Sequence, residues 1–145
     1  MKNKKFNIYD LVEGKAEITI STGVKEIHPL VETIASNLAD LEHIRFIRIT
    51  PDTLFASSEI SEGRIPIPIT KPDHPTASGV QLIIDQAFNY IQFYEITSSV
   101  QGYGGKMVDV VIKALPIDWQ AIVVMDWSQG FWERMIEKYD NLSRL

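Results

Sequence analysis

The feature of this sequence best suited to chemistry is a glycine-rich turn, Gln101-Gly-Tyr-Gly-Gly-Lys106. It follows a β-branched and aromatic run at residues 89–97 and leads into an amphipathic helix pattern at residues 106–115. Gly102 and Gly104 can adopt positive φ angles, which lets a ligand approach the backbone closely. The first N–H groups of the helix lack intrahelical partners and can donate to a phosphate or diphosphate. The alternative interpretation is a tight strand-to-helix turn that simply needs glycine.

Other motifs that carry chemistry are absent. The phosphate loop of nucleotide hydrolases has Ser or Thr after Gly-Lys, but Met107 follows Lys106 here. Met107 also stands where a dinucleotide-binding turn has its third glycine. There is no Gly-x-Ser-x-Gly elbow of a serine hydrolase. The three histidines, His28, His43 and His74, show no metal-ligand spacing, so we expect no metal site.

The composition limits the classes of protein to consider. At 145 residues, with 45% hydrophobic and 23% charged residues, the chain is expected to form one domain with a substantial core. A net charge of −5 argues against nucleic acid as a partner. The lack of cysteine excludes disulfides and thiolate catalysis and fits a reducing compartment. No apolar run approaches the roughly 18–20 residues of a membrane span. We therefore expect a cytoplasmic protein with neither membrane nor nucleic-acid partners.

Local patterns predict alternating strands and helices. We expect strands at residues 15–21, 45–50, 54–58, 79–85, 89–97 and 120–125, and helices from Pro29 to about His43, from Lys106 to about Leu115 and from about Ser128 onward. The run 79–97 could instead be one helix, but its β-branched and aromatic content favours a hairpin.

A proline-rich segment, residues 51–79, separates the two halves of the chain. It holds five of the seven prolines, and its part 64–70 is either an edge strand or an extended loop. The whole segment is either a substrate flap or an extended surface crossing. Three acidic residues in it either attract a cationic amine or form a solvated loop: Asp52, Glu59 and Glu62.

Residues 79–140 resemble the GNAT family of N-acetyltransferases. In that family, a strand leads into the signature Gln/Arg-x-x-Gly-x-Gly/Ala, which opens a helix and binds the diphosphate of acetyl-coenzyme A. Here Gln101, Gly102 and Gly104 match the signature, whereas Lys106 replaces its small last residue. The next strand and helix also match, with Asp126 near a family asparagine. Trp132 stands where the family usually has a tyrosine acid.

The resemblance implies a single α/β domain, residues 1–145, with a GNAT-like mixed central sheet flanked by helices. It also implies that strands 89–97 and 120–125 run parallel and diverge at the glycine turn, where the pantetheine arm pairs with free backbone groups. A backbone N–H near residues 96–98 would polarise the acetyl carbonyl. The implied acetyl-coenzyme A site consists of Ile96, Thr97, Ser98, Gln101, Gly102, Tyr103, Gly104, Gly105 and Lys106.

Catalysis would need a base and an acid. Glu95 stands where family members often place a general base, and strict alternation would put it on one face with Ile91 and Phe93. The alternative for Glu95 is a paired or exposed carboxylate at a strand end. Because the indole of Trp132 cannot donate the proton that the leaving thiolate needs, Tyr139, Tyr103 or a water would supply it.

These patterns predict an enzyme that transfers an acetyl group from acetyl-coenzyme A to a primary amine of a small molecule or peptide, by direct attack. A homodimer is common in the family. Lys106 and Trp132 favour an alternative, a GNAT-fold module that binds an acyl-coenzyme A or a partner protein without catalysis. In a third interpretation, the domain is structural and the glycine turn is only a turn.

Overall fold

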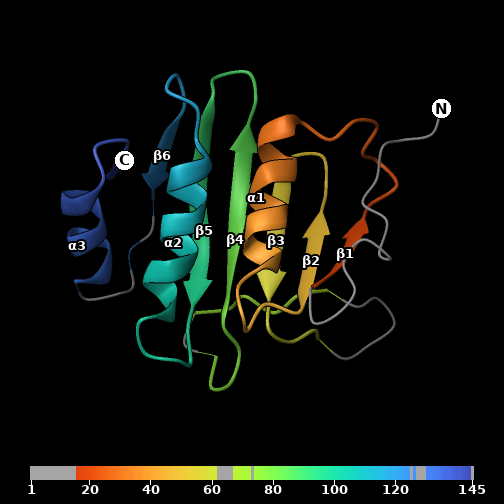
Figure 1. The fold of residues 1–145 in the computed structure, drawn as a ribbon, viewed down its shortest axis with the longest axis horizontal. Coiled ribbons are helices and arrows are strands. Elements are labelled where there is room, and N and C mark those ends of the chain that lie inside the picture. The colour runs from red at the N-terminus through yellow and green to blue at the C-terminus, as the bar shows by residue number, and fades with distance from the viewer. Residues whose placement is uncertain (1–15, 62–66, 73, 125, 127–129, 145) are drawn as a thin grey trace.

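The computed structural model describes residues 16–61, 67–72, 74–124, 126 and 130–144, which form one small α/β domain (Figure 1). Its described elements make a seven-stranded mixed sheet and three helices. In chain order, they are β1 (Glu17–Ile20), α1 (Pro29–Ala39), β2 (Phe46–Ile49), β3 (Thr53–Ser57), β4 (Gly79–Asp85), β5 (Tyr90–Thr97), α2 (Tyr103–Ala114), β6 (Gln120–Val123), α3 (Phe131–Lys138) and β7 (Leu142–Arg144). Within these residues, no helix has the length and apolar character needed to cross a bilayer.

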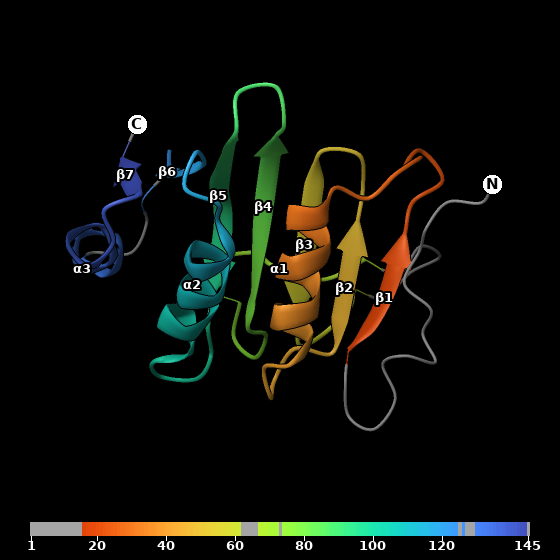
Figure 2. The ribbon, with the colours of Figure 1, turned by 45° about the horizontal axis from the view of Figure 1, so that its top comes forward.

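The strands lie in the sheet in the same order as in the chain. Strands β2 to β5 form an antiparallel meander, whereas β1 pairs with β2 in parallel, as do β5 with β6 and β6 with β7. A helix connects each parallel pair, since parallel neighbours need a crossover connection. Helices α1 and α2 lie side by side on one face of the sheet, and α3 lies at the edge beside β7 (Figures 1 and 2). The expected α/β class and mixed sheet are therefore confirmed.

The core lies between the sheet and its helices. Strand residues that face the helices are almost fully buried, as in the row formed by Ile47, Ala56 and Val80 across β2, β3 and β4. The alternate residues, such as Arg48, Phe55 and Gln81, are only half-buried and point to the opposite side. We call that side the open face.

Most expected elements are present. The run 79–97 is the antiparallel hairpin β4–β5, as its β-branched and aromatic content favoured, and the alternative of a single helix is wrong. Strand β7 was not expected, and two helix boundaries differ. Helix α1 ends at Ala39, short of His43, because the chain turns at Asp40, whose N–H bonds back to Asn37 and Leu38. Helix α2 begins at Tyr103 and includes Gly104 in its first turn, so Gly102 alone of the turn glycines has a positive φ, 82°.

Candidate functional site

The parallel strands β5 and β6 separate just before the glycine turn. Their pairing runs from Tyr90 opposite Gln120 to Phe93 opposite Val123. Strand β5 then continues to Thr97 and stays paired with β4 on its other side. Beyond Phe93, the β6 side of β5 pairs with no strand among the described residues. We call this opening the split.

A β-bulge at Tyr94 coincides with the start of the split. Phe93 lies opposite Leu82 and Glu95 lies opposite Gln81, so Tyr94 is the extra residue between them. A bulge increases local twist and bends its strand. It also reverses the alternation of side chains. Glu95 therefore lies on the open face, in one row with Gln81, and the expectation that it shares a face with Ile91 and Phe93 is wrong.

The backbone of Ile96 faces the split. Strand residues alternate between their two neighbours in hydrogen bonding. Because the Ser58 N–H donates to the Ser78 carbonyl at 2.8 Å, the even-numbered residues of β4 bond to β3 and its odd-numbered residues bond to β5. Glu95 and Thr97 lie opposite odd-numbered residues and so bond to β4. Between them, Ile96 directs its N–H and C=O towards the split, as the prediction of a backbone donor near residues 96–98 requires.

The amides at the start of α2 are not capped by a side chain. Gly102 is the N-cap residue, and no side-chain hydrogen bond caps the helix. The Tyr103 N–H donates to the Val100 carbonyl at 3.1 Å. The N–H groups of Gly104 and Gly105 come next, within the first turn, where a helix offers no internal acceptor. A Cβ atom built on Gly105 would have no neighbour within 4 Å outside its own helix backbone, so the space beside its Cα atom is open.

A cavity of about 490 Å³ lies against these amides. One wall is the glycine turn and the start of α2, and the other is one side of α3. The lining residues are Ser98, Val100, Gln101, Gly102, Gly104, Gly105, Phe131, Arg134 and Met135. A volume of this size falls within the range of cofactor sites, about 300–1,000 Å³. Arg134 is the cation in this lining, and its exposed side chain makes no ion pair with a described residue. The cavity thus combines donor amides with a positive charge, which suits an anionic ligand.

No protein-family model, curated protein or solved structure matches this chain.

The residues predicted to bind the cofactor fall into two groups. Five line the cavity: Ser98, Gln101, Gly102, Gly104 and Gly105. Four do not: Ile96, which faces the split; Thr97, which is buried; Lys106, which is exposed outside the lining; and Tyr103, which is in the core. The Tyr103 hydroxyl accepts a hydrogen bond from the His43 N–H at 3.1 Å, and burial raises the pKa of this phenol. Tyr103 therefore anchors α2 to the chain after α1, with its hydroxyl directed away from the cavity.

Tyr139 makes a hydrogen bond outside the cavity lining. Its hydroxyl donates to Asp109 Oδ1 of α2 at 2.5 Å. Burial, followed by the bond to Asp109, raises the pKa of Tyr139 to about 12. The hydrogen bond from Tyr139 is also the main cause that lowers the pKa of Asp109, and the charge of Lys113 lowers it further by a smaller amount. The catalytic role of Tyr139 remains a prediction, and the contacts seen here join α2 to the end of α3.

Two residues of the family-like segment are also engaged in packing or pairing. Trp132 is 3% exposed and its ring packs against Phe93, with ring centroids 5.0 Å apart. Asp126, near the family's asparagine position, forms a 2.7 Å ion pair with Arg144. Trp127 and Ser128, which the sequence places in the same turn, lie outside the described residues.

Glu95 has a buried hydrogen-bond partner. Thr70 Oγ1 donates to Glu95 Oε1 at 3.3 Å, and Thr70 is 4% exposed. The proline-rich segment therefore returns to the sheet beside the candidate base. Of the part 64–70, expected as an edge strand or an extended loop, residues 64–66 lie outside the described residues. Pro68 forms one isolated antiparallel bridge with Ile60, so the described part is no regular edge strand.

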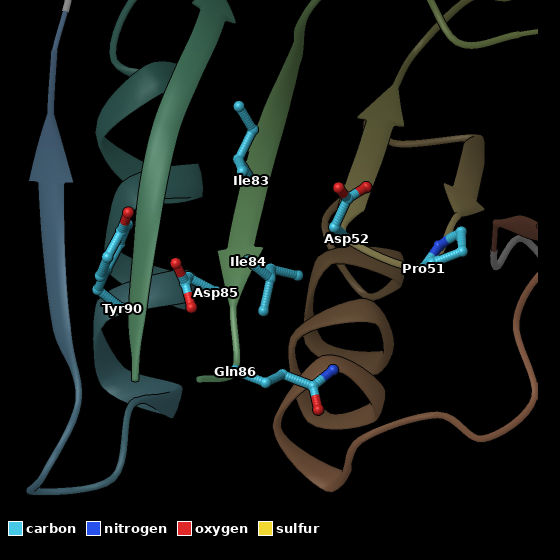
Figure 3. A pocket seen from close by; sticks show the side chains of 7 residues that line it. All are labelled: Pro51, Asp52, Ile83, Ile84, Asp85, Gln86 and Tyr90. Carbon is cyan, nitrogen blue, oxygen red and sulfur yellow. The ribbon is translucent and has the colours of Figure 1, made fainter. Parts of the chain in front are cut away.

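A second hollow, of about 380 Å³, lies at the other end of the β4–β5 hairpin (Figure 3). Its lining residues are Pro51, Asp52, Ile83, Ile84, Asp85, Gln86 and Tyr90. Asp85 already accepts from the Phe88 N–H at 3.0 Å, which fixes the hairpin turn. Asp52 and Glu59 lie beyond opposite ends of β3, so these two do not form the acidic cluster that the sequence suggested; Glu62 is outside the described residues. No group of three or more metal-ligating side chains occurs in the described part of the chain.

Sequence reasoning missed three parts of the site: the bulge, the Thr70 contact and Arg134. Of these three, only Arg134 could have been located from the sequence. It stands four residues after Gly130, the N-cap of α3, and so lies one turn into that helix.

Proposed function

We propose that this protein is an N-acetyltransferase that moves an acetyl group from acetyl-coenzyme A to a primary amine. The observation that carries this proposal is that one short stretch of chain holds both features: the described pairing of β5 with β6 ends at Phe93, and the turn that follows β5 lines the cavity from Ser98 to Gly105. Ile96 faces the split, and a short turn later Gly104 and Gly105 present uncapped amides to the cavity. Together these groups form a track for an extended ligand that has an anionic end.

The residues of the cavity fit the diphosphate of the cofactor. The N–H groups of Gly104 and Gly105 donate to its oxygens, supported by the positive end of the helix dipole. Arg134 adds charge-assisted hydrogen bonds from the opposite wall. Lys106 is exposed outside the lining, so its long side chain does not fill the space that the family keeps for a small residue.

The residues of the split fit the acyl end. Acetyl-coenzyme A supplies the acetyl group as a thioester. The Ile96 N–H donates to the carbonyl oxygen and stabilises the negative charge that develops there. The amine nitrogen forms a bond to the carbonyl carbon, the carbon–sulfur bond breaks, and the sulfur leaves with the electron pair. Glu95 accepts a proton from the amine, water protonates the thiolate, and the products are an amide and free coenzyme A.

Two measurements on one sample test this function. Acetyl-coenzyme A should raise the melting temperature, because a ligand that binds the native state stabilises it. Thiol release should then appear with at least one member of a panel of primary amines, from small polyamines to peptide N-termini. No thermal shift at millimolar cofactor would refute the proposal and leave the glycine turn a structural feature.

One observation favours a second candidate, a module of the same shape that binds an acyl-coenzyme A or a partner without catalysis. Trp132 is packed in the core and the Tyr139 hydroxyl is bonded to Asp109, so neither offers an acid to the split. If this candidate is correct, acetyl-coenzyme A should raise the melting temperature, but no amine of the panel should cause the release of free coenzyme A thiol. The cytoplasmic location and the homodimer remain predictions under either function.

A further inference from the structure

The part of the proline-rich segment that returns to the sheet is fixed at several points. We call residues 67–72 and 74–78 the strap. Ser57 Oγ, at the end of β3, donates to the Ile69 carbonyl at 2.5 Å. Ser99 Oγ, in the segment between β5 and the glycine turn, donates to the Thr76 carbonyl at 2.8 Å, and the Ser99 N–H donates to Ser78 Oγ at 3.1 Å. The strap is thus bonded both to the sheet and to the segment that leads into the glycine turn.

Thr70 is the strap residue that touches the candidate base. Its side chain is buried, and its hydroxyl donates to Glu95 Oε1. The neighbouring Ile69 is held through its carbonyl by the fully buried Ser57, so the Thr70 backbone is anchored one residue away. The donor is therefore built into the fold and does not depend on a mobile surface side chain.

The contact leaves the second carboxylate oxygen of Glu95 available. The bond to Thr70 is the one side-chain hydrogen bond that Glu95 makes among the described residues. A free glutamate side chain samples several rotamers, and fixing it costs conformational entropy. Because Thr70 donates to Oε1 at 3.3 Å, part of that entropy is lost during folding, and Oε2 stays free to accept a proton.

Glu95 and Ile96 are adjacent on β5, with their side chains on opposite faces of the sheet. The Ile96 N–H lies in the plane of the sheet and faces the split. An amine that approaches from the open face thus meets Glu95 beside the carbonyl that Ile96 polarises. We propose that Thr70 is a positioning residue, which orients the Glu95 carboxylate to take the proton of an amine arriving from the open face. This inference rests on the proposed acetyltransferase function.

The step is balanced with water as the one further participant. The amine nitrogen bonds to the acetyl carbon, the carbon–sulfur bond breaks, and the proton lost by nitrogen goes to Glu95 Oε2. The sulfur leaves with the electron pair and takes a proton from water. Thr70 neither gains nor loses a proton, because its hydroxyl stays bonded to Oε1. Its effect should therefore appear in turnover and leave cofactor binding unchanged.

Three variants test the role of Thr70. Thr70→Val removes the donor and keeps the shape, Thr70→Ser restores the donor, and Thr19→Val is a control on the exposed strand β1. Each is assayed for thiol release with the best amine of the panel, for KM of acetyl-coenzyme A, and for thermal shift with acetyl-coenzyme A. We expect Thr70→Val to lower kcat about 10-fold, since a misplaced catalytic group costs up to about 100-fold. KM and the thermal shift should stay unchanged, and Thr70→Ser should recover most of kcat.

A double-mutant cycle shows whether Thr70 acts through Glu95. Glu95→Gln should lower kcat by about 100-fold, the lower range for loss of a general base. Adding Thr70→Val to Glu95→Gln should cause no further loss, because the carboxylate to be positioned is gone. A purely structural threonine would lower the melting temperature and add its effect to that of Glu95→Gln.

The outcomes separate this inference from the proposed function. Wild-type-like kcat in Thr70→Val, or additive losses in the cycle, overturns the inference and leaves the acetyltransferase intact. A thermal shift without turnover in the wild type supports the binding module, so there is no base to position and the inference falls as well. If acetyl-coenzyme A causes no shift in the wild type, both proposals are wrong.

Discussion

Gly104→Ala should separate cofactor binding from folding stability. An added Cβ atom would lie 3.4 Å from Phe131 Cε1 and Cζ and 4.0 Å from Ser98 Cβ. These are ordinary van der Waals distances, so the methyl group fits without displacing its neighbours. Gly104 has no positive φ, and alanine favours a helix over glycine by up to about 1 kcal/mol. We expect the free protein to be as stable as the wild type or slightly more stable.

Binding should respond in the opposite direction. The same methyl group occupies cavity space between Ser98 and Phe131, next to the uncapped amides. Loss of one hydrogen bond to a charged group costs about 1.5–3 kcal/mol, which is a factor of about 10–150 in Kd. A ligand present at 100 times Kd stabilises the wild type by about 2.7 kcal/mol, and a 100-fold weaker variant by about 0.4 kcal/mol. At about 2–4 °C per kcal/mol, the thermal shift should fall from about 5–11 °C to about 1 °C.

The assay is a thermal melt with and without acetyl-coenzyme A, with Kd then measured by titration calorimetry. Ser36→Ala is the matched control, because Ser36 lies exposed on α1 and gains helix propensity without touching the cavity. It should keep the full shift. An undiminished shift in Gly104→Ala would refute the placement of the diphosphate on these amides, even if the protein binds the cofactor elsewhere.

Three further predictions test the charge of the cavity, the aromatic candidate and the packing of the sheet. Arg134→Gln should weaken acetyl-coenzyme A binding about 10-fold in titration calorimetry, with Lys25→Gln unchanged; equal affinities would remove Arg134 from the site. Tyr139→Phe should lower the free energy of unfolding, measured with denaturant at pH 7, by about 1–2 kcal/mol. It should leave the thermal shift caused by acetyl-coenzyme A unchanged. The hydrogen bond lowers the pKa of Asp109 in the folded protein. The stability that the bond adds is therefore complete above the unfolded-state pKa of about 3.9 and is lost as the pH falls through the lower folded-state pKa. The gap between wild type and Tyr139→Phe should therefore narrow in acid, and a gap that does not change with pH would contradict this assignment. Gly79→Ala should lower stability by about 3 kcal/mol, because its Cβ would lie 2.5 Å from the Ala56 carbonyl oxygen; Gly105→Ala, with open space for its methyl group, should fold as the wild type does.

The parts of the fold predicted from sequence are those with a local cause. Hairpin β4–β5 follows from two β-branched runs around a short turn, where Asn89 takes a positive φ of 58°. The uncapped start of α2 follows from the glycines themselves. Strand β7 was missed, because its three residues offer too little pattern to distinguish a strand from a loop.

The parts that escaped prediction depend on partners far away in the chain. The bulge at Tyr94 exists only in the register with Gln81 and Leu82, and a slip of one residue reverses the face of every side chain beyond it. For that reason the sequence could name Glu95 but not the face it occupies. Thr70 and Glu95 are 25 residues apart, and no local rule joins a proline loop to a strand end.

The fate of the leaving thiolate bears on the choice between enzyme and binding module. The two tyrosines considered as acids make other contacts here: the Tyr139 hydroxyl donates to Asp109, and the Tyr103 hydroxyl accepts from the His43 N–H. Trp132, at the position of the family's tyrosine, packs on Phe93. An alkyl thiol has an ordinary pKa of about 8.5, so near neutral pH its thiolate is a stable enough leaving group to take a proton from water. The attacking amine is the more demanding partner, because it is protonated at neutral pH and must lose a proton to react. A missing tyrosine therefore costs this site less than a missing base would. The proposed catalysis consequently depends on Glu95, which the bulge turns to the open face and which accepts a hydrogen bond from Thr70 there.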